Sequence, residues 1–328
     1  MADMTLDQSL RELGPSGASG DVRAAVGRSF GTFGELLQGT LPRTGQHFMV
    51  TCPLDAWSTA AFRYLPGGSS VVVHPPHKRK SARLASLALR AAGRRGGGEL
   101  WLHSELPEGK GMASSSADLV ATARAVAEAV GTRFTASDIE SLLRQIEPSD
   151  GVMYDGIIDF DHRNVRLRER LGTLPSMVIV AHDEGGQVDT VSYNSTVGTH
   201  SDTERREYAC LLDTAREAVR HADLAALGRV ATRSAKLNAR YNPRRALGPV
   251  LRVCREIDAL GVVCAHSGTM LGILIRRGDP EAEAKIEAAR FGCAALPGVT
   301  TVHQSLGNEG GGRQHGPPPD AMSGPPTT

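Results

Sequence analysis

A chain of 328 residues is long enough to bury a sizeable hydrophobic core in one or two domains. Its 37 lysines and arginines nearly balance 36 aspartates and glutamates, and the net charge of +1 gives no general attraction to nucleic acid or membranes. Aromatic residues are only 4% of the chain, which disfavours a base-stacking surface. No apolar run approaches the length of a membrane span and the N-terminus lacks an apolar signal core, so we expect a cytoplasmic protein that binds neither nucleic acid nor membrane.

The five cysteines are Cys52, Cys210, Cys254, Cys264 and Cys293, scattered widely along the chain with no C-x-x-C pair. Their odd number and wide spacing fit neither a disulfide framework nor a zinc site. We therefore expect free thiols, most of them buried in the core.

Residues 1–25 contain a cluster of glycine and serine and are expected to form a disordered extension. The stretch GRSFGTFGELLQGTLP, at residues 27–42, is punctuated by glycines and predicts a strand, a tight turn and a return strand. Within it, Glu35 has the chemistry to bind an ammonium group, and Gln38 to hydrogen-bond a carboxylate or a hydroxyl. An ordinary glycine-rich hairpin would carry the same polar pair on its surface.

Strand-forming patterns follow at residues 58–64 and 70–74. The basic sequence PPHKRK at residues 75–80 is typical of a solvated turn. Alanine and leucine at helical spacing predict a helix over residues 81–92, and ELWLHS at residues 99–104 predicts a strand.

The stretch PEGKGMASSSADLVATA, at residues 107–123, joins that strand to a helix expected over residues 116–129. Gly109 and Gly111 allow the backbone to approach a ligand closely. The unpaired NH groups and the dipole of the helix N-terminus attract an anion such as phosphate. The three serines have hydroxyls able to cap the helix, bind phosphate or reach a magnesium ion. The pattern matches neither a Walker A loop nor a dinucleotide fingerprint.

A helix predicted over residues 137–145 is followed by the densest acidic cluster of the chain. The members of this cluster are Glu147, Asp150, Asp155, Asp159 and Asp161. Carboxylates beside a phosphate loop serve either to bind magnesium or to orient and deprotonate a substrate hydroxyl. For Asp159 and Asp161 we favour a plain surface turn.

The second half of the chain predicts a buried strand at residues 177–181, helices at 205–227, 227–236 and 281–290, and an edge strand at 299–306. Asp183 and Asp189, in the loop after the first of these strands, are candidates either for substrate binding or for a structural turn. The small residues of AHSGTMLGIL, at residues 265–274, permit close backbone approach. From residue 307 the chain lacks the apolar content to fold, and we expect a disordered tail.

The glycine- and serine-rich stretch fits the pattern P-x-x-x-G-[LM]-[AG]-S-S-[AS]-A from Pro107 to Ala117. This pattern resembles the phosphate loop of the GHMP small-molecule kinases, named for galactokinase, homoserine kinase, mevalonate kinase and phosphomevalonate kinase. Met112 stands where the family more often has leucine. The sequences GELLQG around Glu35 and EPSD ending at Asp150 resemble the L-threonine kinase branch of this family. The sequence SGTMLG, at residues 267–272, is similar to a thinned form of the family's late glycine motif.

The resemblance implies an α+β GHMP kinase fold with two domains. Residues 26–170 would form the N-terminal ATP-binding domain that carries the phosphate loop, and residues 171–306 a C-terminal domain with a ferredoxin-like sheet. The disordered segments would be residues 1–25 and 307–328. ATP and the acceptor would meet in the cleft between the two domains.

The resemblance also implies roles for individual residues. Those implied in ATP binding are Pro107, Gly109, Lys110, Gly111, Met112, Ala113, Ser114, Ser115 and Ser116. Magnesium would be bound by Ser115 and Glu147. Asp150 is the implied catalytic base, with Asp155 as its rival, and some family members lack a clear base. Those implied in acceptor binding are Glu35, Gln38, Gly39, Ser267, Gly268 and Thr269.

The implied activity is phosphoryl transfer from Mg-ATP to the hydroxyl of L-threonine, giving O-phospho-L-threonine for cobalamin side-chain synthesis or a related pathway. Alternative acceptors are homoserine and a modified hydroxy amino acid. A catalytically silent ligand sensor with the same fold is a further alternative, and the presence of both Glu147 and Asp150 argues against it. The sequence does not indicate an oligomeric state.

Overall fold

The computed structural model describes residues 24–186, 200–266 and 268–308. Its strands are β1 (Ala24–Thr40), β2 (His47–Leu65), β3 (Val71–His74), β4 (Gly97–Ser104), β5 (Ile157–Asp161), β6 (Arg166–Gly172), β7 (Met177–Asp183), β8 (Gly261–Cys264), β9 (Met270–Arg276) and β10 (Val299–Gln304). Its helices are α2 (Arg79–Ala91), α3 (Ser114–Ala129), α4 (Ala136–Leu143), α6 (Asp202–Arg220), α7 (Leu224–Asn238), α8 (Leu247–Glu256) and α9 (Ala282–Ala294). The two segments expected to be disordered lie outside the described residues, apart from residues 24, 25, 307 and 308.

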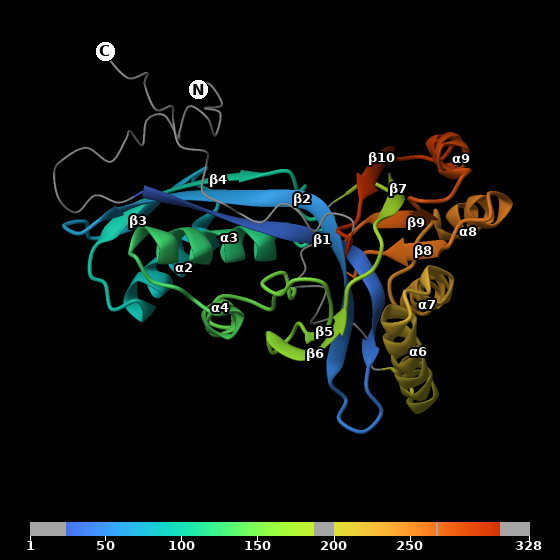
Figure 1. Ribbon diagram of the computed structural model, residues 1–328, viewed down its shortest axis with the longest axis horizontal. Helices are drawn as coiled ribbons and strands as arrows, with labels where there is room; N and C mark the ends of the chain where they lie inside the picture. Colours follow the sequence, from blue (N-terminus) through green and yellow to red (C-terminus); the bar gives the residue numbers. More distant parts are fainter. Residues whose placement is uncertain (1–23, 187–199, 267, 309–328) are drawn as a thin grey trace, which may run out of the picture.

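One mixed sheet runs through the described part of the chain, in the strand order β10-β7-β9-β8-β1-β2-β4-β3. Strands β5 and β6 form a side arm, because β5 pairs with β2 and β6 pairs with β5. The pairing of β3 with β4 is parallel, and the other named pairings are antiparallel. In Figure 1 the two long strands β1 and β2 (blue) run along α2 and α3 and then turn sharply downward near β5. The α+β fold expected for the chain is therefore confirmed.

Helices α2 and α3 cover one face of the sheet formed by β1, β2 and β4, and α4 packs on these two helices (Figure 1). Helix α3 is buried on most of its surface, as expected for a helix that is apolar almost all round. Gly27 in β1 allows α3 to lie very close to the sheet, since a Cβ at this position would be 2.3 Å from the Ala121 carbonyl oxygen. This close packing fixes the middle of α3 against β1.

The second half of the chain builds its own core around β7, β8 and β9. Helices α8 and α9 pack against these strands through residues such as Val250, Ile273 and Cys293. Helix α7 contacts both β8 and β1, and α6 lies beside α7 (Figure 1). The strand β1 therefore contacts elements from both halves of the chain.

The glycine-rich stretch at residues 27–42 differs from its prediction, because it forms one continuous strand and no tight turn. The chain reverses later, where the Leu41 amide donates to the Gln46 carbonyl at 2.9 Å, and β2 is the return strand. The glycines produce irregularities in β1 instead. Gly34 has φ +53°, and a Cβ on it would lie 2.4 Å from the Cys264 carbonyl oxygen.

Other predicted elements have a counterpart in the structure, with three corrections. The helix boundary expected at Leu227 was wrong, because α6 ends before Ala222, which has φ +52°, and Asp223 caps α7 by accepting from the Ala226 amide at 2.9 Å. Asp159 and Asp161 do not form a surface turn but lie buried on β5, where Asp159 pairs with Arg168. The elements β5, β6, α8, β8 and β9 had not been predicted.

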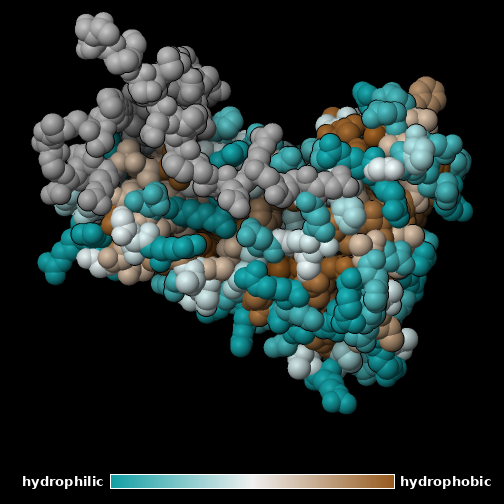
Figure 2. Space-filling view, in the orientation of Figure 1, coloured by the Kyte–Doolittle hydropathy of each residue, from teal (hydrophilic) through white to brown (hydrophobic). Residues whose placement is uncertain are grey.

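The polarity of the surface and the state of the cysteines agree with the expectations drawn from the composition. Figure 2 shows hydrophilic residues over most of the face in view, with smaller hydrophobic areas between them. In the part of the chain that the structure describes, no helix is long and apolar enough to cross a membrane. All five cysteines are free thiols, as predicted, and only Cys210 is exposed.

Candidate functional site

The loop between β4 and α3 has the strand–loop–helix setting that the sequence predicts. Gly109 and Gly111 have φ +71° and +83°, in the left-handed region that favours glycine. Helix α3 begins at Ser114, two residues earlier than expected, and its N-cap is Ala113 with φ +56°. Of the three roles open to the serines, the structure does not show capping, since no side chain caps this helix. The first-turn NH groups that a side-chain cap would satisfy therefore remain available for an anion.

Backbone contacts from two directions hold this phosphate loop in place. In β1, the Thr32 amide donates to the Met112 carbonyl at 3.2 Å, and the Gly34 amide donates to the Gly111 carbonyl at 3.3 Å. On the other side, Gly268 lies so close that an added Cβ would be 1.9 Å from the Lys110 carbonyl oxygen. The irregular strand β1 and the late glycine segment thus clamp the loop between them.

A cavity of about 570 Å³ opens in front of the loop. Its lining comes from the start of α2 at residues 77–81, from residues between 108 and 118, and from the acidic segment at residues 147–150. Glu35, Met49, His162 and His266 complete it. The fold therefore brings together one set of predicted residues, namely Glu35, Gly109, Gly111, Met112, Ala113, Ser114, Ser115, Ser116, Glu147 and Asp150.

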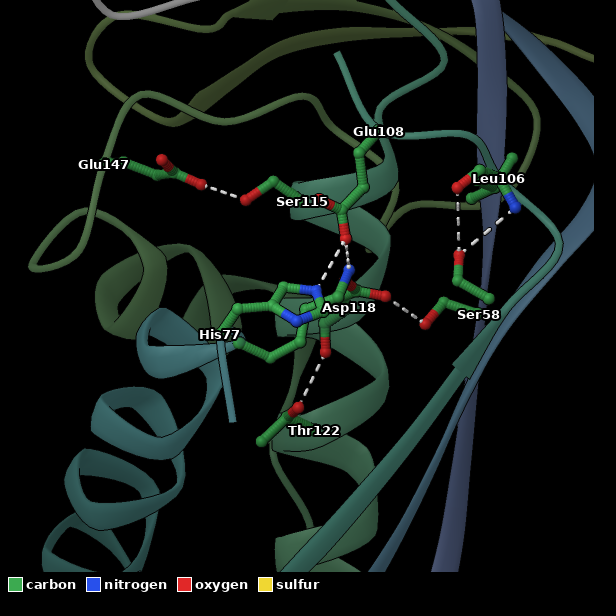
Figure 3. A network of polar contacts seen from close by, with 10 residues as sticks. Ser58, His77, Leu106, Glu108, Ser115, Asp118, Thr122 and Glu147 are labelled. Atoms are coloured by element: carbon green, nitrogen blue, oxygen red, sulfur yellow. Dashed lines mark hydrogen bonds and ion pairs between the residues drawn. The ribbon is translucent and has the colours of Figure 1, made fainter. Parts of the chain in front are cut away.

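Ser115 and Glu147 meet at the wall of this cavity. The Ser115 hydroxyl donates to the Glu147 carboxylate, as Figure 3 shows, and the ammonium group of Lys80 pairs with the same carboxylate. A hydroxyl and a carboxylate side by side are oxygen ligands of the kind that Mg²⁺ prefers. Among the described residues no group of three or more His, Cys, Asp or Glu could hold a metal ion.

Asp150 lies beside the first turn of α3. Its amide donates to the Ser116 hydroxyl at 3.0 Å, and the same hydroxyl lies 3.3 Å from its Oδ2. Burial raises the pKa of Asp150 to about 6, with a further increase from the nearby Glu147 and an opposing effect of the Ser116 hydrogen bond. A carboxylate with this pKa is ionised at neutral pH and is still basic enough to accept a proton. The rival Asp155 is exposed and does not line the cavity.

Glu35 is a buried carboxylate that lines the same cavity, with 3% of its surface exposed. Its Oε2 atom is inaccessible to solvent and has no hydrogen-bond partner within the described part of the chain. Burial raises the pKa of Glu35 well above its ordinary value, and the nearby Asp150 raises it further. A cationic group in the cavity would satisfy this oxygen and offset the repulsion between the two carboxylates.

Gln38 and Gly39 lie behind the cavity rather than in it. The Gln38 side-chain oxygen accepts from Asn238 Nδ2 at 3.0 Å and lies 2.5 Å from His266 Nδ1. Gly39 packs against the ring of Tyr208, where an added Cβ would be 2.5 Å from ring carbon Cγ. Both residues line a second, smaller cavity of about 20 Å³, so their placement indicates support of the site from behind.

Lys110 and Thr269 also point away from the main cavity and are linked through Asp183. The Lys110 ammonium group pairs with Asp183 at 2.6 Å, and the Thr269 hydroxyl donates to the same carboxylate at 2.5 Å. These contacts join the phosphate loop to the late glycine segment. Pro107 and Gly268 do not line the cavity either. Ser267 and Asp189, two other candidates, lie outside the described residues.

The sequence analysis missed a charged network at the start of α2. The segment at residues 75–80, expected to be a solvated turn, places Lys78 in the cavity wall with only 14% of its side chain exposed. Lys78 pairs with Asp118 of α3 and with Glu108 of the phosphate loop. The Ser58 hydroxyl donates to Asp118 at 2.5 Å, as Figure 3 shows. The one available signal was Asp118 itself, a lone carboxylate inside the apolar run of α3.

Comparison with known proteins supports this fold. The model of the GHMP kinases N terminal domain matches residues 80–159. An L-threonine kinase of Citrobacter freundii is 28% identical over 258 residues, covering 77% of this chain and 87% of that protein. An L-threonine kinase of Salmonella typhimurium is 26% identical over 258 residues, covering 77% of this chain and 83% of that protein.

A solved structure of similar fold is the homoserine kinase of Cytophaga hutchinsonii, with a TM-score of 0.68 at 15% identity. The superposition covers 90% of this chain and 98% of that one. The match to the family model includes the phosphate loop, and the fold similarity extends over nearly all of the chain. The chain is thus similar to the GHMP kinases in sequence around the phosphate loop and in its fold.

Proposed function

We propose that this protein is a GHMP kinase that transfers the γ-phosphoryl group of ATP, as its magnesium complex, to the side-chain hydroxyl of L-threonine. The products would be ADP and O-phospho-L-threonine. The observation that carries the proposal is that the phosphate loop, the Ser115–Glu147 pair, Asp150 and the buried Glu35 all line one cavity. The relatives named L-threonine kinase support the choice of acceptor.

The ATP phosphates would bind in front of the phosphate loop. Backbone NH groups between Gly109 and Ser115 would donate to the phosphate oxygens, and the positive end of the α3 dipole would favour their charge. Met112, with 1% of its surface exposed, anchors the loop in the core rather than contacting ligand through its side chain. Pro107 and Lys110 would act on ATP only by shaping the loop.

Ser115 and Glu147 would hold Mg²⁺, which neutralises charge on the β- and γ-phosphates when it is bound. Lys80 pairs with Glu147 in the ligand-free protein and thereby neutralises a carboxylate that is largely withdrawn from solvent. The ion pair must open for Glu147 to bind a metal, which leaves the ammonium group of Lys80 free at the cavity mouth. Its positive charge would then face the phosphates.

Asp150 would accept the proton of the threonine hydroxyl. As that oxygen forms a bond to the γ-phosphorus, the bond from phosphorus to the β,γ-bridging oxygen breaks and ADP leaves with the electron pair. The hydroxyl proton passes to an oxygen of Asp150, whose pKa of about 6 suits this transfer near neutral pH. Ser116 keeps the carboxylate directed at the loop through its hydrogen bond.

Glu35 would bind the ammonium group of the amino acid. Its Oε2 has no partner among the described residues, and a positively charged donor is the group that satisfies it best. Gln38, Gly39, Gly268 and Thr269 would shape the acceptor site indirectly, through the contacts behind it. Homoserine also carries an ammonium group, so Glu35 alone does not separate it from threonine.

We also propose that the two domains divide near residue 170, toward the end of β6, with the acceptor and ATP meeting where β1 contacts both halves. We propose that the product, O-phospho-L-threonine, is used in cobalamin side-chain synthesis or a related pathway. The two relatives named L-threonine kinase align with 77% of this chain, and their names do not specify a pathway.

The acceptor is tested by ADP release from Mg-ATP with a panel of matched compounds. L-threonine is compared with L-serine, L-homoserine and 3-hydroxybutanoate, which has the carbon skeleton of threonine without the ammonium group. Threonine should be the best acceptor and 3-hydroxybutanoate a very poor one. Glu35→Gln should raise KM for threonine by about 10- to 100-fold, since it removes a charged hydrogen bond, while leaving 3-hydroxybutanoate unaffected. Equal turnover of threonine and 3-hydroxybutanoate would contradict the proposal.

A further inference from the structure

An ion pair crosses the cavity from the phosphate loop to the start of α2. Glu108 lies between Pro107 and Gly109 in the loop, and its Oε1 is 2.5 Å from the Lys78 Nζ atom. The same Oε1 is 3.3 Å from His77 Nε2, so two basic side chains approach one carboxylate oxygen. All three residues line the cavity, and Figure 3 shows Glu108 directed at this point from the loop above. The carboxylate therefore occupies space in front of the phosphate loop.

Lys78 has a second and more firmly held partner. Its Nζ is 2.5 Å from Asp118 Oδ2, and the Asp118 side chain is 3% exposed. Asp118 is fixed by its place in α3 and by the Ser58 hydroxyl, which donates to Oδ1 at 2.5 Å. This network holds the ammonium group of Lys78 at the cavity wall whether or not Glu108 is present.

The two partners of Lys78 differ in how easily they can leave. The side chain of Glu108 is 54% exposed, so it can turn into water at little cost, whereas Asp118 has no such route. Burial lowers the pKa of Lys78, but Asp118 and Glu108 outweigh this effect and raise the pKa above its ordinary value. The hydrogen bond from Lys78 lowers the pKa of Glu108. Lys78 is therefore a fixed cation with one permanent and one exchangeable partner.

We propose that Lys78 binds the phosphates of the nucleotide, and that Glu108 forms an ion pair with this lysine until the nucleotide displaces the Glu108 carboxylate. The inference rests on the proposed ATP-dependent function. A nucleotide carries several negative charges and many acceptor oxygens, so it makes stronger charge-assisted hydrogen bonds than one half-exposed carboxylate. If Glu108 stayed in place, its charge would repel the phosphates. The phosphate loop thus carries a residue that weakens nucleotide binding by competing for the same cation.

The experiment measures the dissociation constant of ATP, with and without Mg²⁺, by isothermal titration calorimetry on the purified full chain. Lys78→Gln should weaken ATP binding by about 10- to 100-fold, because one charged hydrogen-bond donor is lost. Glu108→Gln should tighten it by about 2- to 10-fold, in line with the small strength of an exposed ion pair. In the double variant the gain from Glu108→Gln should disappear, because the lysine for which the two anions compete is absent.

Two control variants match these changes in burial and pairing. Lys285 in α9 is 13% exposed and pairs with Asp279 at 2.8 Å, and Glu217 in α6 is 57% exposed and pairs with Arg220 at 2.6 Å. Lys285→Gln and Glu217→Gln should leave the ATP dissociation constant unchanged. Thermal unfolding of each variant reports whether it is folded, and Glu108→Gln at the surface provides a test even if Lys78→Gln proves unstable.

Two results would overturn the inference while leaving the proposed function intact. One is a Lys78→Gln variant that folds and binds ATP as tightly as the wild type. The other is a gain from Glu108→Gln that is absent, or that persists in full without Lys78. If the wild-type protein itself bound no nucleotide, the proposed function and this inference would both fall.

Discussion

Asp150 is the residue whose physical state says most about the mechanism. Its pKa of about 6 arises mainly from burial, which disfavours the charged form that a base needs. We expect kcat/KM to increase about tenfold per pH unit below 6 and to level off above it, because only ionised Asp150 accepts the proton. Asp150→Asn should lower kcat by about 10²- to 10⁴-fold. A pH–rate profile of the wild type, and kcat of the variant at pH 8, provide the measurements.

The same carboxylate should reduce stability at neutral pH. Its pKa rises from 3.8 to about 6 on folding, so the folded state binds the proton more tightly than the unfolded state does. The free energy of unfolding therefore decreases as pH rises between these two values, and the loss is complete above the higher one. Asp150→Asn should have a higher Tm than the wild type at pH 8 and nearly the same Tm at pH 4. A lower Tm for the variant at pH 8 would contradict this reading.

If Ser115 is a metal ligand, its replacement should change the Mg²⁺ concentration that the reaction requires. Loss of its hydroxyl removes one oxygen ligand and the hydrogen bond to Glu147. Ser115→Ala should therefore require about tenfold more free Mg²⁺ for half-maximal velocity, a change of about 1.4 kcal/mol. The control is Ser141→Ala, at an exposed serine of α4 whose hydroxyl donates only to the Ser137 carbonyl, at 3.0 Å, among the contacts described. An unchanged magnesium requirement in Ser115→Ala would exclude this serine as a ligand.

At the scale of elements, the position of the phosphate loop depends on a close backbone contact. A Cβ on Gly268 would lie 1.9 Å from the Lys110 carbonyl oxygen and 2.3 Å from the Gly111 nitrogen, and neither backbone atom can move freely. Gly268→Ala should therefore cost about 1–3 kcal/mol of stability. It should also lower kcat/KM for both substrates, because the loop shifts.

The matched control for this substitution is Gly248, in the first turn of α8. An added Cβ there meets no atom within 4 Å. Gly248→Ala should leave kcat/KM unchanged and leave stability equal or higher by up to about 1 kcal/mol, since alanine has less freedom in the unfolded chain. Chemical denaturation and steady-state kinetics on both variants separate a local clash from a general intolerance of alanine.

Prediction from sequence succeeded where an element carries its own periodic pattern. Helix α3 and strand β4 are of this kind, and so is α4, whose capping box on Thr135 is local. It failed at residues 27–42, where glycine is equally compatible with a turn and with an irregular strand. The choice was made by partners far along the chain: Cys264 leaves no room for a side chain at Gly34, and Met112 accepts a hydrogen bond from β1.

For the whole molecule, the cavity is assembled from segments that the sequence keeps far apart. The phosphate loop and the acidic segment were predictable because each has a local signature. The position of Lys78 in the cavity wall was not predictable, because a basic turn has the same sequence pattern whether its side chains face water or a buried aspartate such as Asp118. Gln38 was expected to contact substrate but is engaged by Asn238 and His266, from α7 and the late glycine segment. Such contacts depend on how the two halves of the chain pack.

The central claim is that the protein transfers the γ-phosphoryl group of ATP to L-threonine in this cavity. It is tested most directly by following O-phospho-L-threonine by phosphorus NMR in a mixture of purified protein, Mg-ATP and L-threonine, beside an acceptor-free blank and Asp150→Asn. The account predicts a new phosphate ester that appears in step with ADP, requires threonine and is nearly absent from the variant. ATP binding with no threonine-dependent ester, or an ester that forms equally well with Asp150→Asn, would contradict it.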